Sequence, residues 1–374
     1  MKIVLAPDSF KGSLSSPDVC AAMRRGAQRV FPDAQIEGVP LADGGEGTLD
    51  ALLQSMGGFA KTGWVRGPMG EDVEASWGIL PDGTAVIELA QAAGFALVCP
   101  QKRDALRAST FGVGQQIRAA LDAGARRFWI GLGGSATTDG GTGLLSALGA
   151  RFFDAKDRVL EPGGGDLERL ERIDLQFFDP RLSRCEFVAL ADVSNPLCGS
   201  NGAARVFAPQ KGATPEQVEQ LERGLNRLAE VAAQRLERDA HNQPGAGAAG
   251  GTGFGALAFL NATMRPGIEA VLEAAHFNEK IAGADLILTG EGSLDAQTLN
   301  GKTIAGVCRE ARKARVPVVA LGGRVALSGE QMDELGLQSA FSVVDGPREL
   351  GWCLENGAAL VESATERILR MWPR

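Results

Sequence analysis

The chain has 374 residues, enough for two domains, and its 38 basic and 46 acidic residues give a net charge of −8. Apolar residues make up 44% of the chain and charged residues 22%, proportions typical of a folded soluble protein. The acidic balance argues against nucleic acid as the main partner, because binding many phosphates requires a basic surface. The longest uncharged run, between Asp239 and Arg265, is mostly glycine and alanine, so we reject it as a membrane span.

The scarcity of some residue types limits which side chains could act in catalysis. With two histidines and no tyrosine, acid–base catalysis must fall mainly on Asp, Glu and Lys. None of the six cysteines forms a C-x-x-C pair, so we interpret them as reduced thiols of a cytoplasmic protein. The apolar stretch 3–6 ends at Pro7 and is too short for a signal peptide, so we expect no targeting segment.

The first part of the chain predicts strands and helices in alternation. Residues 2–6 indicate a buried strand, and Ser16-Pro17-Asp18 indicates a helix that ends near Phe31, with Ser16 as its N-cap. A second strand is expected over 36–42 and a second helix over 48–56. This order of elements favours a parallel sheet.

The pattern changes from about residue 61. Segments 73–80 and 84–89 alternate in polarity around a turn at 81–83, which predicts a β-hairpin and therefore a mixed sheet. Helices are expected over 110–123, 141–148 and 214–240, and strands over 127–132 and 185–191. The glycine-rich stretch 245–255 is interpreted as flexible.

Strands and helices alternate again late in the chain, with strands over 285–289 and 316–321 and a helix over 304–314. We therefore expect an α/β protein in which residues 1–64 and 280–374 form one open domain. Residues 65–279 would be inserted into it as a mixed α/β domain, because loops near sheet ends tolerate insertions. Two sequential domains are the alternative.

Glycine is about twice as frequent as its usual share of roughly 7%, and much of the excess lies in loops that follow predicted strands. Ligands of open α/β sheets bind at the carboxyl ends of the strands. Loops that combine glycine with carboxylates and hydroxyls at those ends therefore indicate an active site. They are residues 7–13, 43–48, 133–141, 192–196 and 290–298.

The loop 133–141 has a glycine pair at each end and leads into a predicted helix. Converging backbone N–H groups and a helix N-terminus favour an anion, so we predict a phosphate site here. The spacing is not that of a Walker A loop. The alternative is a turn in which Asp139 caps the helix. The predicted phosphate ligands are Gly133, Gly134, Ser135 and Thr137.

Charged residues in the other loops supply the remaining candidates. Asp8 and Lys11 follow the first strand, and Asp192 follows a buried strand. Asp43 could bind Mg²⁺ or a substrate hydroxyl. Each of these residues could instead be a turn or capping residue. Glu291, Asp295 and Lys302 surround a loop of small polar residues, and we interpret them as functional.

Phosphoryl transfer is the chemistry that these groups fit, because it needs a phosphate site, Mg²⁺ on carboxylates, a lysine and an acidic base. A hydrolase triad is disfavoured, since histidine is scarce and no G-x-S-x-G motif occurs. A nicotinamide dehydrogenase is disfavoured because no G-x-G-x-x-G follows the first strand. Carboxylates on several loops favour an enzyme over an anion-binding protein.

Taken in order, the motifs resemble those of bacterial type-1 glycerate kinases, over most of the chain from residue 2 to at least residue 323. They are APDSFKGSL at 6–14, ADGGEGT at 42–48, GGSAT at 133–137, Asp192 with NPL at 195–197, FAPQKGA at 207–213, TGEG at 289–292, DAQT at 295–298 and GK at 301–302. The resemblance implies ATP-dependent phosphorylation of D-glycerate, generally at the 2-hydroxyl. It also implies a flavodoxin-like domain built from both chain ends, with a second α/β domain inserted.

We accordingly expect Asp8 or Asp192 to accept the hydroxyl proton and Lys11 to neutralise charge on the phosphoryl group or the glycerate carboxylate. The expected Mg²⁺ ligands are Asp43 and Glu291. Further substrate or phosphate contacts are expected from Ser9, Gly44, Gly45, Asp295 and Lys302. The alternatives are a non-catalytic sugar-acid or phosphate-binding protein on the same scaffold and, less well matched, a homoserine- or mevalonate-type kinase. The oligomeric state stays open.

Overall fold

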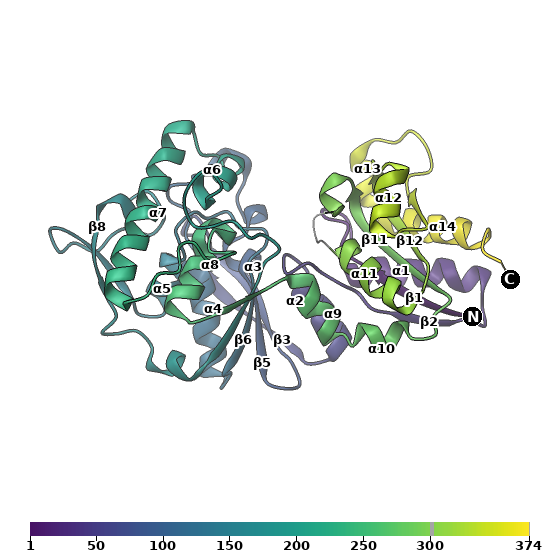
Figure 1. Ribbon diagram of the computed structural model, residues 1–374, viewed down its shortest axis with the longest axis horizontal. Coiled ribbons are helices and arrows are strands. Elements are labelled where there is room, and N and C mark those ends of the chain that lie inside the picture. Colours follow the sequence, from purple (N-terminus) through teal and green to yellow (C-terminus); the bar gives the residue numbers. More distant parts are fainter. Residues whose placement is uncertain (300–302, 374) are drawn as a thin grey trace. The chain divides into compact units, whose positions relative to one another are not determined.

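The computed structural model describes residues 1–299 and 303–373, and the chain divides into two compact units (Figure 1). Unit 1 consists of residues 1–43, 50–57 and 268–374, and unit 2 of residues 44–49 and 58–267. Unit 1 therefore draws on both ends of the chain, and its α/β class is as expected.

Unit 1 contains a five-stranded parallel sheet in the order β13-β12-β11-β1-β2. Counted in chain order within this unit, the strands are arranged 2-1-3-4-5, which is the flavodoxin-like order. The expected fold is thereby confirmed. The strands are β1 (Lys2–Pro7), β2 (Gln35–Gly38), β11 (Leu286–Leu294), β12 (Val318–Val325) and β13 (Ser339–Ser342).

Two long helices of unit 1 cover one face of this sheet. In α1 (Ser16–Val30) the N-cap is Ser15, one residue earlier than expected, and its Oγ accepts a hydrogen bond from the backbone of Asp18. Gly26 of α1 packs so closely on α14 (Gly357–Leu369) that a Cβ there would lie 2.4 Å from the Glu362 carbonyl. The other helices are α2 (Thr48–Met56), α9 (Gly267–Ala274), α10 (Phe277–Ile281), α11 (Thr303–Ala314), α12 (Gly329–Leu335) and α13 (Leu350–Glu355).

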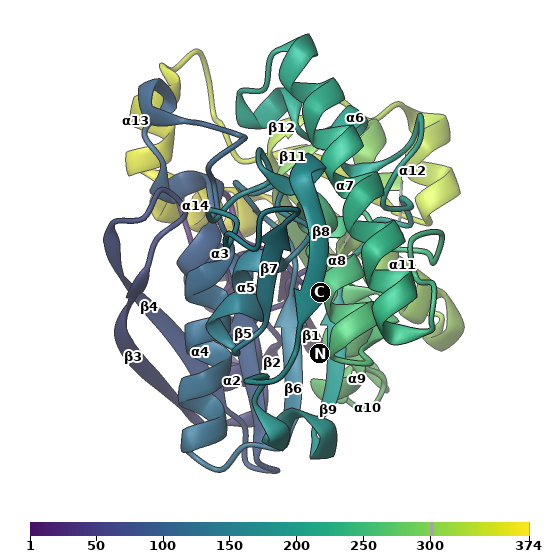
Figure 2. The same cartoon turned by 90° about the vertical axis from the view of Figure 1, so that its left-hand side faces the viewer.

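Unit 2 contains a six-stranded mixed sheet in the order β10-β9-β6-β5-β4-β3. The predicted hairpin is present, with Trp77 of β4 opposite Ile87 of β5, and β3 extends it at the edge of the sheet (Figure 2). The other four strands of this sheet, β5, β6, β9 and β10, run parallel to one another. The bounds are β3 (Phe59–Arg66), β4 (Asp72–Ile79), β5 (Thr84–Glu88), β6 (Arg127–Gly131), β9 (Glu186–Leu190) and β10 (Thr263–Arg265).

Helices pack around the second sheet. The longest begins at a capping box formed by Thr214 and Gln217. A two-stranded sheet, β7 (Arg151–Asp154) with β8 (Leu170–Asp174), lies outside the main one. The helices are α3 (Leu89–Ala93), α4 (Phe111–Asp122), α5 (Thr142–Ala147), α6 (Ala203–Phe207), α7 (Pro215–Leu236) and α8 (Ala248–Phe259).

The interpretation of residues 245–255 as flexible is corrected by the structure. These residues are largely buried, and those from Ala248 onward belong to α8. Gly250 has a φ of +65°, and a Cβ on it would lie 1.9 Å from the Thr137 carbonyl oxygen. The N–H of Gly247 donates to the Asn195 carbonyl at 2.9 Å. The glycines therefore permit close packing against the loop 133–141.

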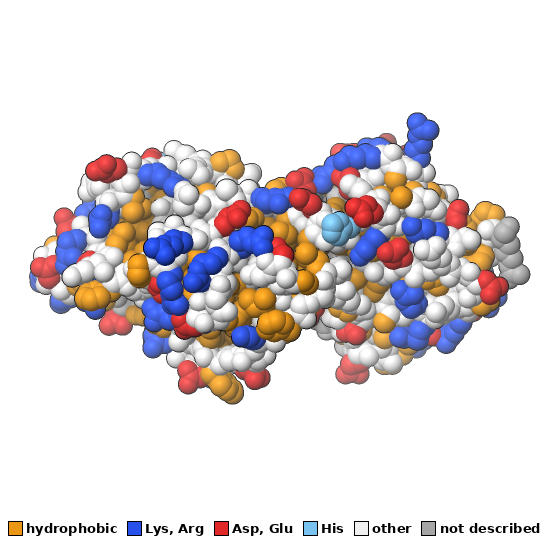
Figure 3. Space-filling view, turned by 90° about the horizontal axis from the view of Figure 1, so that it is seen from below, with side chains coloured by type: hydrophobic (Ala, Val, Ile, Leu, Met, Phe, Trp, Pro, Cys, Tyr) orange, Lys and Arg blue, Asp and Glu red, His pale blue; other side chains and the backbone are white. Residues whose placement is uncertain are grey.

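Among residues 1–299 and 303–373, no helix is both long and apolar enough to cross a membrane. On the face shown in Figure 3, acidic and basic side chains are interspersed.

Candidate active site

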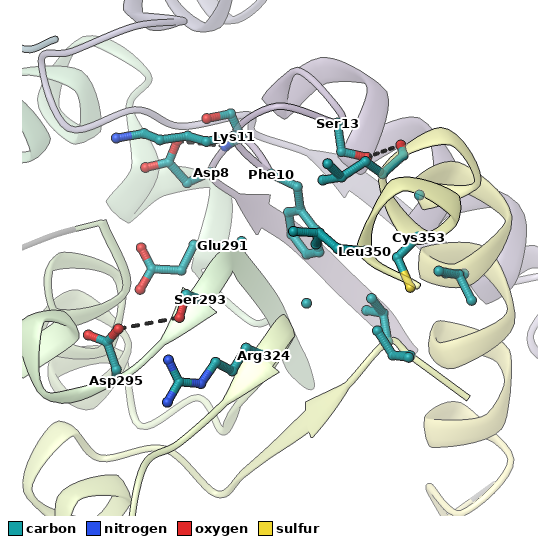
Figure 4. Close-up of a pocket in the computed structure, with 18 of the residues that line it drawn as sticks. Asp8, Phe10, Lys11, Ser13, Glu291, Ser293, Asp295, Arg324, Leu350 and Cys353 are labelled. Atoms are coloured by element: carbon teal, nitrogen blue, oxygen red, sulfur yellow. Dashed lines mark hydrogen bonds between the residues drawn. The ribbon is translucent and has the colours of Figure 1, made fainter. Parts of the chain in front are cut away.

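A cavity of about 570 Å³ opens in unit 1 at the carboxyl ends of its strands (Figure 4). The order of the strands reverses between β1 and β11, and such a switch point is where open α/β sheets bind ligands. The structure thus brings together the loops that follow β1 and end β11, as the sequence indicated. The charged side chains among the lining residues are Asp8, Lys11, Asp43, Glu291, Asp295, Arg324 and Arg348.

Asp8 is held firmly at the end of β1. Its backbone N–H donates to the Gly290 carbonyl at 2.8 Å, and its carboxylate accepts from the Ser9 N–H at 2.6 Å and from the Thr303 hydroxyl. Burial, and then the nearby charge of Asp43, raise the pKa of Asp8 to about 7, against the opposing effects of these hydrogen bonds and of Lys11. At neutral pH this carboxylate can therefore both hold and release a proton.

Two cations beside the cavity are available to a ligand. Within the described part of the chain, neither Lys11 nor Arg324 forms a side-chain hydrogen bond or an ion pair. Both side chains are exposed, and Figure 4 shows them on the same side of the cavity as Asp8 and Glu291. Lys302, the other cation expected from the sequence, lies outside the described residues.

The carboxylates of β11 and its following turn are positioned by neighbouring hydroxyls. The Thr298 hydroxyl donates to Oε1 of Glu291 at 2.6 Å, and Ser293 donates to Oδ2 of Asp295 at 3.3 Å. Thr298 is almost fully buried. It therefore fixes the Glu291 side chain at the edge of the cavity.

A second group of expected residues lies in unit 2. Gly44 and Gly45 pack against the start of the loop 133–141, where a Cβ on Gly133 would lie 2.5 Å from the Gly45 Cα. Gly134 has a φ of +72°. Glycine at these positions allows the two backbone segments, at residues 44–45 and 133–134, to approach closely.

Lys211 lies beneath this loop and is only 3% exposed. Its Nζ donates to the Ser135 hydroxyl at 2.9 Å and to the Thr137 carbonyl at 2.6 Å. Burial lowers the pKa of Lys211 to about 7, although the charge of Asp139 opposes the shift. Lys211 therefore holds the predicted phosphate ligands Ser135 and Thr137 in place.

The helix end of the loop has a different role from the one first expected. The buried Asp139 carboxylate accepts from the N–H groups of Gly141 at 3.0 Å and Gly143 at 3.2 Å, and from both the N–H and the hydroxyl of Thr110. These N–H groups are satisfied by the protein itself, so here the structure favours the capping interpretation. A phosphate site at residues 133–137 stays a prediction.

Asp192, the second candidate base, also lies in unit 2 and is partly exposed. Its Oδ1 accepts a hydrogen bond from the Gly267 N–H at 2.9 Å, at the start of α9. The residue thus has a structural contact at a helix N-terminus, whereas the structural alternative expected for it was a turn at the start of its own loop.

The family model described as "Glycerate kinase family" matches residues 3–373. The chain belongs to the glycerate kinase family. Escherichia coli K12 has a relative named glycerate 2-kinase that is 46% identical, covering 92% of this chain and 91% of that protein. A Bacillus subtilis 168 relative named glycerate kinase is 43% identical, covering 98% of this chain and 97% of that protein. A crystal structure assigned as glycerate kinase 2 of Salmonella typhimurium LT2 is 42% identical with a TM-score of 0.86, covering 99% of this chain and 97% of that one.

In this glycerate kinase family member, three positioning residues were missed from the sequence. They are Lys211, Thr298 and Thr303, which hold Ser135, Glu291 and Asp8 respectively. Lys211 and Thr298 each lie within a motif that carried the resemblance, so a polar residue in a family motif was the available signal. Their partners could not be assigned, because the contacts join segments as far apart as 295 residues.

Proposed function

We propose that this chain transfers the γ-phosphoryl group of ATP to the 2-hydroxyl of D-glycerate, giving 2-phosphoglycerate and ADP. The observation that carries the proposal is the cavity of unit 1, in which the buried Asp8 lies with Lys11 and Glu291 at the switch point of the sheet. Family membership supports the substrate, and the name of the Escherichia coli relative supports the 2-position.

Asp8 is the proposed proton acceptor. A general base works best when its pKa lies near the operating pH, and burial brings the pKa of Asp8 to about 7. Asp192 is the alternative base, but it is not among the residues that line this cavity. Asp8 would take the proton of the glycerate hydroxyl as that oxygen attacks the γ-phosphorus.

Cations and backbone N–H groups would bind the anionic parts of the substrates. Lys11 would neutralise charge on the transferring phosphoryl group or on the glycerate carboxylate. The loop segment Gly133, Gly134, Ser135 and Thr137, with Gly44 and Gly45 packed against it, would contact phosphate. Ser9, Asp295 and Lys302 are the remaining proposed substrate contacts.

Mg²⁺ is the proposed metal, with Asp43 and Glu291 as its ligands. Within residues 1–299 and 303–373, no three His, Cys, Asp or Glu side chains form a group that could hold a metal ion alone. That fits Mg²⁺, which is usually bound by one or two carboxylates together with substrate phosphates. The negative charge of Asp43, which helps to raise the pKa of Asp8, also supports a cation in this cluster. When bound, Mg²⁺ would neutralise charge on the phosphates of ATP.

A coupled assay of ADP release tests the proposal. D-glycerate should stimulate ADP release from MgATP, whereas 3-hydroxypropionate, which lacks the 2-hydroxyl, should not. Absence of stimulation by D-glycerate would contradict the kinase activity and favour the non-catalytic binding protein. Equal stimulation by 3-hydroxypropionate would contradict transfer to the 2-position.

A further inference from the structure

The unit 1 cavity has two chemically different halves. Figure 4 shows Asp8, Lys11 and Glu291 on one side and Phe10, Leu350 and Cys353 on the other. The apolar side continues along the end of β13 and along α13. Its main members are Phe10, Val343, Val344, Leu350, Cys353 and Leu354. Phosphoryl transfer as described above uses only the charged half.

The size and chemistry of the apolar half exclude D-glycerate as its occupant. The whole cavity, about 570 Å³, lies within the range of roughly 300–1,000 Å³ typical of sites for ligands far larger than a three-carbon acid. D-glycerate consists of a carboxylate and two hydroxyl-bearing carbons, so it has no apolar surface to place against this wall. Of the two proposed substrates, only ATP carries an apolar ring system.

We propose that the apolar half of this cavity binds the purine base of ATP and that the charged half receives its phosphates. The inference rests on the proposed kinase function, which supplies ATP as a ligand. It adds the location of the nucleotide in unit 1 and the residues that recognise its base.

Contacts within the chain position the apolar wall. The Ser13 hydroxyl donates to the Leu354 carbonyl at 2.7 Å, which ties the loop containing Phe10 to α13. Phe10 and Leu14 exchange two backbone hydrogen bonds at 2.9 Å, which close this loop into a tight turn. Gly357 permits the approach, because a Cβ there would lie 2.3 Å from the Ser13 Oγ. A wall held by the chain's own contacts lowers the entropic cost of ordering side chains around the base.

The cations of the cavity fit phosphates at the opposite end. Lys11 and Arg324 form no side-chain hydrogen bond or ion pair within the described residues, so their donors are available. Arg348, by contrast, lies 3.5 Å from Asp345 and stacks 4.5 Å above the Trp352 ring. Lys11 and Arg324 are therefore the cations that would meet the phosphates.

The substitution Cys353→Phe tests the base site, because its ring would fill the apolar half. Cys353 is partly buried at the edge of the core of unit 1, so folding of the variant is checked by circular dichroism. Cys99→Phe, at an exposed cysteine that does not line the cavity, is the matched control. By calorimetry, Cys353→Phe should weaken binding of MgADP about ten-fold or more, the order of effect of a steric mismatch in a pocket. Inorganic tripolyphosphate and D-glycerate should bind with unchanged affinity, and the control should bind all three normally.

Unchanged binding of MgADP to folded Cys353→Phe would overturn the inference. Loss of D-glycerate affinity in place of MgADP affinity would also overturn it, since the apolar half would then belong to the acid. A wild-type protein that binds MgADP in this way but fails to phosphorylate D-glycerate would refute the proposed function and leave the base site supported.

A second measurement needs no variant. MgADP should protect Cys353, but not Cys99, from alkylation by iodoacetamide, as read by mass spectrometry of the wild-type chain. Equal labelling of Cys353 with and without saturating MgADP would contradict the base site.

Discussion

Asp8 in unit 1 and Lys211 in unit 2 are both buried ionisable groups, but their surroundings differ. Asp8 borders a cavity that a ligand can enter, and Lys211 is enclosed by the loop that it holds. Burial disfavours the charged form of each, so it raises the pKa of the acid and lowers the pKa of the base, both to about 7. The comparison shows that a shifted pKa by itself does not distinguish a reacting group from a positioning one. The access of a ligand to the group distinguishes them.

The largest effect is expected from Asp8→Asn. Loss of a general base typically lowers the rate about 10²–10⁴-fold, and we expect kcat to fall by that order. Asp192→Asn should lower kcat far less, because Asp192 acts at the N-terminus of a helix. Steady-state kinetics measures kcat of both variants, and circular dichroism checks that both are folded. A larger loss of kcat in Asp192→Asn would assign the base to Asp192.

Lys11→Met should have the next largest effect. It removes the cation that we propose neutralises charge on the phosphoryl group or the glycerate carboxylate, and we expect kcat/KM for D-glycerate to fall about 10²-fold. Lys156→Met, at an exposed lysine in unit 2, is the control and should have normal kinetics. Near-normal kcat/KM in Lys11→Met would show that Lys11 is only a surface turn residue.

Gly250→Ala tests how closely residue 250 packs against the loop 133–141, which Lys211 holds through the Thr137 carbonyl. The new Cβ would meet the Thr137 carbonyl at 1.9 Å, and we expect the free energy of unfolding to fall by about 2–3 kcal/mol. Gly283→Ala has a similar φ of +68° but no neighbouring atom within 4 Å, so it should cost only about 1 kcal/mol. Urea unfolding measures both, and equal losses would contradict close packing at Gly250.

Lys211 also contributes a pH dependence of stability. Its pKa is about 7 in the folded chain against an ordinary value of 10.5, so the unfolded chain binds more protons between these values. The contribution of Lys211 to the free energy of unfolding should therefore rise with pH from about 7 to about 10.5. Urea unfolding at a series of pH values should show a shallower rise in Lys211→Met than in wild type or Lys156→Met. Identical slopes in all three proteins would mean that Lys211 is not buried with a depressed pKa.

Much of unit 1 could be predicted because its signals are local. The strand at 2–6, the loop at Asp8 and the strand before Glu291 each show in a short window of sequence, and the parallel order places their ends together. The resemblance of the motifs to those of glycerate kinases is confirmed by the family match.

The parts that could not be predicted depend on long-range packing. Lys211 meets Ser135 across 76 residues, and no local pattern indicates that contact. The stretch 245–255 has the composition of a flexible linker, yet Gly250 serves close packing on Thr137. The glycine pair at 140–141 was interpreted as an anion site, whereas Asp139 satisfies the N–H of Gly141. Glycine alone does not reveal whether a loop approaches a ligand or another part of the protein.

The most direct test of the central claim is phosphorus NMR of the product formed from D-glycerate and MgATP by the wild-type chain. We expect a phosphomonoester resonance coupled to the single proton on carbon 2, appearing together with ADP. A resonance coupled to the two protons on carbon 3, or the formation of ADP and inorganic phosphate alone, would contradict the assignment of this chain as a glycerate 2-kinase.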